Sequence, residues 1–176
     1  MNASTRPAIA RARVARATEW TLLCALVAAC STPAADTAIS ANGLIVRGAF
    51  APEPLAAGDS ASATMSAYFV VENTRDADTL DAIATPVAAH ATVHAEVQHG
   101  GMVIMMPAVG LEIPAHGTIR LRPGARHVML EGLSSVPRAG DRVPLVLHFR
   151  HAGVVRLAVP VIRYVSIDSA VEADAR

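Results

Sequence analysis

The sequence has few aromatic residues, no lysine and only two cysteines, and each shortage restricts the core, the partners or the chemistry that the protein can have. Phe, Trp and Tyr make up only 3% of the 176 residues although 52% are hydrophobic, so a core must consist mainly of Val, Leu, Ile and Ala. All 15 basic residues are Arg, they balance 15 acidic residues, and they form no basic run. Nucleic-acid-binding proteins need a basic surface, so we expect no nucleic-acid partner.

The first 29 residues have the organisation of an export signal. Four Arg residues precede an apolar stretch at residues 20–29, which is too short to span a bilayer as a helix. Small residues then lead directly to Cys30, as in the lipobox of bacterial lipoproteins, where the cysteine is acylated. We predict a lipoprotein-type signal peptide at residues 1–29, lipidation of Cys30 and a periplasmic location on a bacterial membrane. The alternatives are an ordinary signal peptide cut nearby or a short anchor.

The two cysteines restrict the redox and metal chemistry. Cys24 is lost with the predicted signal and Cys30 is then the only thiol, so no intramolecular disulfide is possible. A blue-copper electron-transfer centre needs a Cys thiolate beside two His, which a lipid-linked Cys30 does not supply. Removal of residues 1–29 leaves 11 Arg against 14 acidic residues. The mature chain is therefore mildly acidic, with a net charge of about −3.

Beyond the signal, the pattern is that of one all-β domain. We expect a flexible tether at residues 30–42, a β-domain at 43–166 and a disordered tail at 167–176. Short β-rich runs alternate with turn signals, and none keeps a helical period. About nine short, mostly antiparallel strands of this kind predict a Greek-key β-sandwich or barrel. The expected strands are Leu44–Phe50, Met65–Glu72, Leu80–Ala84, Thr92–Gln98, Met102–Met106, Thr118–Arg122, Arg126–Leu130, Arg142–Arg150 and Val154–Val165.

A hairpin expected near residue 100 decides whether distant side chains can meet. Side chains alternate along a strand, so His94 lies on the polar face of residues 92–98. A two-residue turn at residues 99–100 puts Met105 directly opposite His94, whereas a turn at residues 100–101 makes it a diagonal neighbour. Both registers keep the two side chains within reach of each other.

A second His and Met pair lies further along the chain. His127 and Met129 are separated by one residue on an expected strand and project from the same face. With His94 and Met105 they offer two imidazoles and two thioethers to one ion. Thioether sulfur is a soft, neutral ligand that selects Cu(I), whereas Zn²⁺ prefers thiolate, imidazole or carboxylate and Ca²⁺ prefers oxygen. Taken singly, each Met is more simply core filler and each His a surface group, but together the four predict a Cu(I) site.

The intervals between these four residues resemble the signature of the periplasmic copper chaperones called PCu(A)C. That signature is a His, ten residues, a Met, 21 residues and then His-x-Met, and His94, Met105, His127 and Met129 reproduce it. The resemblance extends over residues 43–162 and includes the runs at 113–117, 121–124 and 127–133. One departure is Phe50, where the family usually has Trp.

The resemblance implies a cupredoxin-like fold and delivery of Cu(I) toward the dinuclear copper site of cytochrome c oxidase. The implied partners are a Sco-type protein and subunit II of the oxidase. We expect a monomer that touches the membrane only through its lipid anchor. Some members carry a His- and Met-rich tail for a second copper, but no His or Met follows His151 here, so we predict no tail site.

Neighbouring residues leave alternatives open. Met102 and Met106 are possible alternative ligands, but both point away from Met105 on an alternating strand and are expected to pack in the core. His99, at the hairpin tip, is close enough to recruit Cu(II) weakly. An alternative function is an envelope β-sandwich for adhesion or assembly, with no metal role. No nucleophile with an adjacent base is visible, so we do not expect an enzyme.

Overall fold

The computed structural model describes residues 38–54 and 63–174. Internal contacts divide the chain after Pro33, and every described residue belongs to the second of the two units. The predicted signal peptide and Cys30 lie outside the described residues. Within the described part, no helix is both long and apolar enough to cross a membrane.

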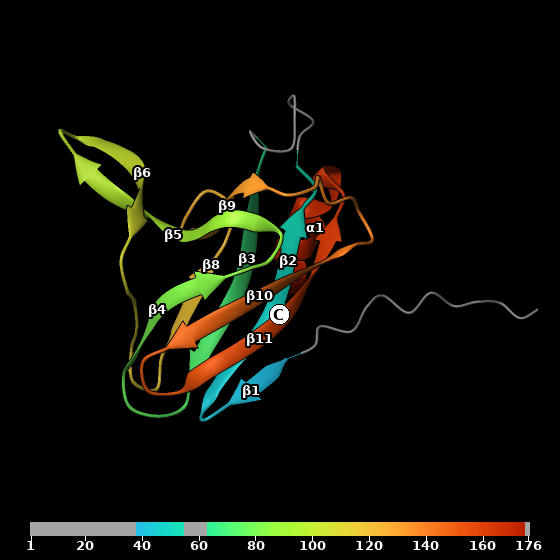
Figure 1. The fold of residues 1–176 in the computed structure, drawn as a ribbon. Helices are drawn as coiled ribbons and strands as arrows, with labels where there is room; N and C mark the ends of the chain where they lie inside the picture. The colour runs from blue at the N-terminus through green and yellow to red at the C-terminus, as the bar shows by residue number, and fades with distance from the viewer. Residues whose placement is uncertain (1–37, 55–62, 175–176) are drawn as a thin grey trace, which may run out of the picture. The chain divides into compact units, whose positions relative to one another are not determined.

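The described residues form eleven β-strands in one mixed sheet (Figure 1). The strands are β1 (Ile39–Ala41), β2 (Leu44–Pro52), β3 (Thr64–Asn73), β4 (Asp78–Ala84), β5 (Ala88–His99), β6 (Met102–Ala108), β7 (Leu111–Ile113), β8 (Thr118–Leu121), β9 (His127–Leu133), β10 (Arg142–Phe149) and β11 (Gly153–Ile162). Their order is β6-β5-β9-β3-β2-β11-β10-β4-β7, with β1 paired to β2 and β8 paired to β3. The pairing of β2 with β11 is parallel and all the others are antiparallel.

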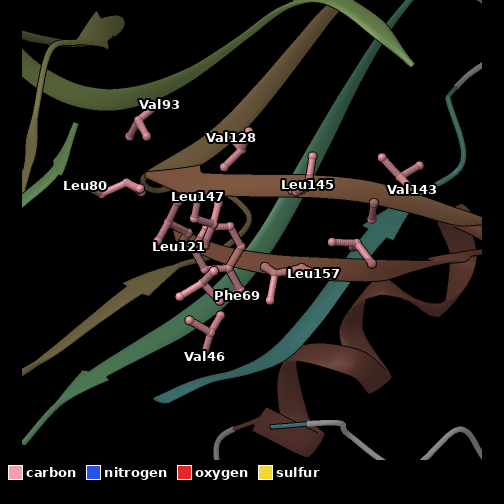
Figure 2. Packing of buried hydrophobic residues seen from close by; sticks show 14 of the residues in the cluster. Val46, Phe69, Leu80, Val93, Leu121, Val128, Val143, Leu145, Leu147 and Leu157 are labelled. Carbon is pink, nitrogen blue, oxygen red and sulfur yellow. The ribbon is translucent and has the colours of Figure 1, made fainter. Parts of the chain in front are cut away.

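The core is made by the alternate side chains of these strands. Figure 2 shows Phe69 of β3, Val128 of β9, Leu145 of β10 and Leu157 of β11 gathered in one apolar cluster. Each is at most 5% exposed, and burial of such side chains stabilises a fold by roughly 1.5–3 kcal/mol each. The buried set is dominated by aliphatic residues, as the low aromatic content predicts. The outward positions of the same strands are therefore free to carry polar and functional groups.

All nine expected strands are present, and the three-residue strands β1 and β7 are additional. The chain differs from expectation at its end, where β11 stops at Ile162 and a 3₁₀ turn (Tyr164–Ser166) and helix α1 (Ile167–Asp174) follow. Ile167, Ala170 and Val171 recur at helical spacing and are half-buried, and α1 packs against β2. A helix thus stands where a disordered tail was expected from residue 167 onward.

The hairpin formed by β5 and β6 projects from the rest of the sheet (Figure 1). Strand β6 is at the end of the strand order, and among the described strands it pairs with β5 alone. Met102 is 66% exposed and Met106 is 46% exposed, so the expectation that they pack in the core is wrong. Strand alternation correctly predicted that they lie on the face of β6 opposite to Met105. That face is exposed because, among the described residues, no second layer covers the hairpin.

Strand β3 organises the region around the predicted metal ligands. One edge of β3 pairs with β9 through residues 64–67 and then with β8 through residues 69–72. Tyr68 lies at the junction between these two pairings. The turn that joins β8 to β9 is therefore held close to Tyr68, directly before His127.

At the opposite end of the sheet, a buried carboxylate connects β4 to the hairpin between β10 and β11. Asp78, at the start of β4, is 6% exposed, and its two oxygens accept backbone N–H groups from Thr79, His151 and Ala152 at 2.7–2.9 Å. Two of these donors belong to the hairpin between β10 and β11, more than 70 residues away in sequence. Asp78 therefore fixes that hairpin against β4.

Candidate metal centre

The hairpin turn is at Gly100-Gly101, the second of the two registers that the sequence allows. Both glycines have positive φ angles, 57° and 82°, as a tight two-residue hairpin turn requires. Met105 consequently pairs with Glu96 and is a diagonal neighbour of His94. The more direct pairing, with Met105 opposite His94, does not occur.

His94 and His127 occupy directly opposed positions on β5 and β9. Their ring centroids are 5.5 Å apart, the ring planes are inclined by 59°, and both residues are half-buried. The Nδ1 atom of His127 lies 2.9 Å from the carbonyl oxygen of Ala125. Because a carbonyl oxygen only accepts hydrogen bonds, this contact places the proton on Nδ1 and leaves Nε2 available as a ligand.

Met129 lies on the same face of β9 as His127, two residues farther along. It is half-buried, and its register partners are Thr92 on β5 and Ser66 on β3. Met129 is therefore a diagonal neighbour of His94. Such neighbours lie about 7–8 Å apart, within reach of a long side chain. The structure therefore groups three of the four predicted ligands, His94, His127 and Met129, on one patch of the sheet.

Met105 is farther from this group and more exposed, at 37%. Its partner Glu96 and the Met129 partner Thr92 are four residues apart on β5, and β5 separates β6 from β9. On a flat sheet this stagger puts the Met105 and Met129 Cα atoms about 16 Å apart. Two methionine side chains do not span that distance to one ion, so joint ligation requires the projecting hairpin to curve toward Met129.

Tyr68 forms a wall of the patch that sequence reasoning missed. Its ring centroid lies 6.4 Å from that of His127, and Phe50 packs on Tyr68 at 5.1 Å. Burial raises the pKa of the Tyr68 phenol above its ordinary value, against the opposing effect of a hydrogen bond with Ser66. The phenol therefore stays neutral at physiological pH. Phe50 thus supports the Tyr68 ring from the side of β2.

Thr92 contributes an unusual buried group beside Met129. Its hydroxyl oxygen is buried and has no hydrogen-bond partner among the described residues. An unsatisfied buried hydroxyl costs free energy. This unsatisfied hydroxyl could not be predicted from the sequence, because Thr is common on strands and its hydrogen-bond partner depends on the register.

The Thr92→Val variant is therefore expected to be more stable than the parent by about 1 kcal/mol, since it keeps the shape and removes the unsatisfied oxygen. Urea unfolding of the metal-free protein measures the change. Thr64→Val, at an exposed position of β3, is the matched control and should leave the free energy of unfolding nearly unchanged. A destabilised Thr92→Val protein would show that the hydroxyl is satisfied.

Comparison with known proteins places the chain in a family. The family model described as "Putative lipoprotein LpqE-like" matches residues 44–161. This chain belongs to the LpqE-like family. A curated relative of the LpqE-like chain, "Putative lipoprotein Lxx21020" of Leifsonia xyli subsp. xyli, is 34% identical over 102 residues. The match covers 57% of this chain and 61% of that relative.

Solved structures share the fold of this LpqE-like protein. The copper-bound PCuAC domain from PmoF2 has a TM-score of 0.60 at 17% identity, over 72% of this chain and 98% of that domain. The apo PCuAC domain from PmoF1 has the same TM-score at 19% identity, over 72% and 99%. Apo-DR1885 from Deinococcus radiodurans has a TM-score of 0.51 at 25% identity, over 94% and 98%. These likenesses confirm the all-β, cupredoxin-like fold and the resemblance to PCu(A)C domains.

Proposed function

We propose that this LpqE-like protein binds Cu(I) through His94, Met105, His127 and Met129 and carries it to an acceptor protein. The observation that supports this most directly is the opposed pair His94 and His127, with Met129 on the same face. The hydrogen bond from His127 to Ala125 adds support, because it occupies Nδ1 and orients the ring so that Nε2 is the nitrogen available to a metal ion. No group of three or more His, Cys, Asp or Glu is arranged for a metal ion in the described residues, so the imidazole pair depends on the thioethers.

The donor chemistry favours Cu(I) over other ions. Two imidazoles and two thioethers are neutral, and the sulfur atoms are soft ligands that hard cations do not prefer. Neutral ligands leave the ion its full charge, which favours a site near the surface over one in the core. The half-buried histidines and the 37% exposed Met105 agree with a site near the surface. Copper-bound structures of PCuAC domains, including the one from PmoF2, are consistent with the proposal.

Binding is proposed to proceed in two steps. His94, His127 and Met129 already share one patch, so they form the first coordination set. Met105 then joins as the hairpin of β5 and β6 curves over the ion, and it leaves first when the metal is handed over. An exposed fourth ligand on a projecting hairpin suits transfer, because an acceptor can replace it without unfolding the domain.

The cellular setting follows from the relatives' names and the predicted signal. Both the family model and the curated relative are described as lipoproteins, which supports a membrane-anchored protein of the bacterial envelope. We propose that Cys30 carries the anchor and that the domain works in the periplasm as a non-catalytic, monomeric carrier. The proposed acceptors are a Sco-type protein and subunit II of cytochrome c oxidase.

Thermal unfolding with and without Cu(I), under reducing conditions, tests this function against a metal-free adhesion or assembly role. The exposed apolar hairpin is the observation that favours the second role. A ligand at 100 times its Kd stabilises a folded protein by about 2.7 kcal/mol, so Cu(I) should raise Tm by several degrees. Zn²⁺ should raise it less. His148→Ala, an exposed position on β10, is the control and should respond like the parent. An unchanged Tm with Cu(I) favours the assembly role.

A further inference from the structure

A second feature of the surface is a hollow that three arginines share. It has a volume of about 450 Å³ and lies over β8 and the turn that leads to β9. Its lining residues are Thr118, Ile119, Arg120, Arg122, Ala125 and Arg126. None of these described lining residues is acidic, and the four proposed copper ligands do not include its arginines.

The three guanidinium groups have no carboxylate partner within the described residues. The nearest acid by sheet register is Glu72, which pairs with Thr118 and is thus diagonal to Arg120. Glu72 is already engaged by Arg47 at 2.8 Å. Three cations around one hollow repel one another, and an anion between them relieves that repulsion. Guanidinium groups match the geometry of phosphate and carboxylate oxygens through paired N–H donors.

The turn below the hollow is fixed by its own backbone. The Arg122 N–H donates to the Arg126 carbonyl oxygen at 2.8 Å, and the Ala125 N–H donates to the Arg122 carbonyl oxygen at 3.1 Å. These bonds close the turn and keep Arg122 and Arg126 close in space. Ala125 lines the hollow, and its carbonyl oxygen is also the acceptor for Nδ1 of His127. One short turn thus joins the hollow to the imidazole.

We propose that the arginine hollow, formed by Arg120, Arg122 and Arg126, binds a phosphate group and that its occupation is felt at His127 through Ala125. The ligand is a free phosphate or the phosphate of an anionic lipid headgroup, since both present the same oxygens. The site does not require copper. Phosphate binding is measured on the metal-free protein, so a negative result there is independent of whether the copper site exists.

The test is an NMR titration of the metal-free protein with inorganic phosphate at low ionic strength. Amide signals of Arg122, Ala125 and His127 should shift together and saturate. The double variant Arg122→Gln/Arg126→Gln should bind phosphate about tenfold more weakly or worse, through loss of charge-assisted hydrogen bonds. Arg156→Gln, an exposed arginine on β11, should bind like the parent. Equal binding by the parent and the double variant overturns the proposal, as does equal weakening by Arg156→Gln.

The source of the phosphate is resolved by a vesicle experiment. The mature chain with Cys30→Ser, which cannot be acylated, is sedimented with phosphatidylglycerol vesicles and with phosphatidylcholine vesicles. If the protein sediments with phosphatidylglycerol vesicles and the double variant does not, the hollow binds a lipid headgroup. Arginine-dependent binding of inorganic phosphate without vesicle binding assigns it to a free anion. Absence of both overturns the site.

Discussion

The Met129→Leu variant is expected to bind Cu(I) at least about 100-fold more weakly than the parent. Loss of groups that merely support a metal ligand costs about 10–100-fold in affinity, and loss of a ligand itself should cost more. Leucine has a similar volume and no sulfur, so the half-buried position beside Thr92 should remain packed. Competition against a Cu(I)-specific chelator measures the affinity, and unchanged thermal stability of the metal-free variant shows that the fold is intact.

Met102→Leu is the matched control for that measurement. Met102 lies on the same hairpin as Met105 and is 66% exposed, but it is on the opposite face of β6. Its substitution should leave Cu(I) affinity within a factor of about two, since it removes a sulfur that is not among the four proposed ligands. Met105→Leu should weaken binding less than Met129→Leu if the hairpin ligand joins last. Equal affinity of Met129→Leu and the parent would contradict the ligand assignment.

The Asp78→Ala variant is expected to lose about 3 kcal/mol of unfolding free energy, because hydrogen bonds to a charged acceptor contribute about 1.5–3 kcal/mol each. The variant leaves the N–H groups of His151 and Ala152 without their acceptor and frees the hairpin between β10 and β11. Urea unfolding gives the value. Asp81→Ala removes an exposed ion pair with Arg150 and should have little effect, since surface pairs contribute little. A similar loss in both variants would contradict the role of the Asp78 hydrogen bonds in holding the hairpin between β10 and β11.

The same carboxylate makes stability depend on pH. Burial acts to raise the pKa of Asp78, but backbone N–H groups of His151, Thr79 and Ala152 outweigh it and hold the pKa below the ordinary 3.8. The folded-state pKa is therefore lower than that of the unfolded chain. Its contribution to stability is present above the unfolded pKa and is lost as the pH falls through the folded pKa. Asp78→Asn should accordingly show a shallower loss of stability below about pH 4.

Much of the fold could be predicted because alternation and turn chemistry are local. The outward faces of His94 and of His127 with Met129 follow from period-two alternation, and the Gly100-Gly101 turn has the two residues that tolerate positive φ. The choice between the two hairpin registers could not be made, because both turns suit the sequence. The structure selects the one that leaves Met105 diagonal to His94.

The features that sequence missed depend on contacts between distant strands. Tyr68 reaches His127 only because β8 and β9 share one edge of β3. The exposure of Met102 depends on the absence of a covering layer over the described hairpin. Helix α1 had a local signal in its apolar spacing, but eight residues are too few for that signal to stand out. The lipidation of Cys30 stays a prediction, since that residue lies outside the described part.

X-ray absorption spectroscopy of the Cu(I)-loaded protein tests the four-ligand site itself, because it counts the sulfur and nitrogen ligands of the bound ion. We expect two sulfur and two nitrogen ligands for the parent, from Met105, Met129, His94 and His127. We expect one sulfur fewer in Met129→Leu and no change in Met102→Leu. A copper ion with only nitrogen and oxygen neighbours in the parent, or an unchanged sulfur count in Met129→Leu, would contradict the four-ligand site.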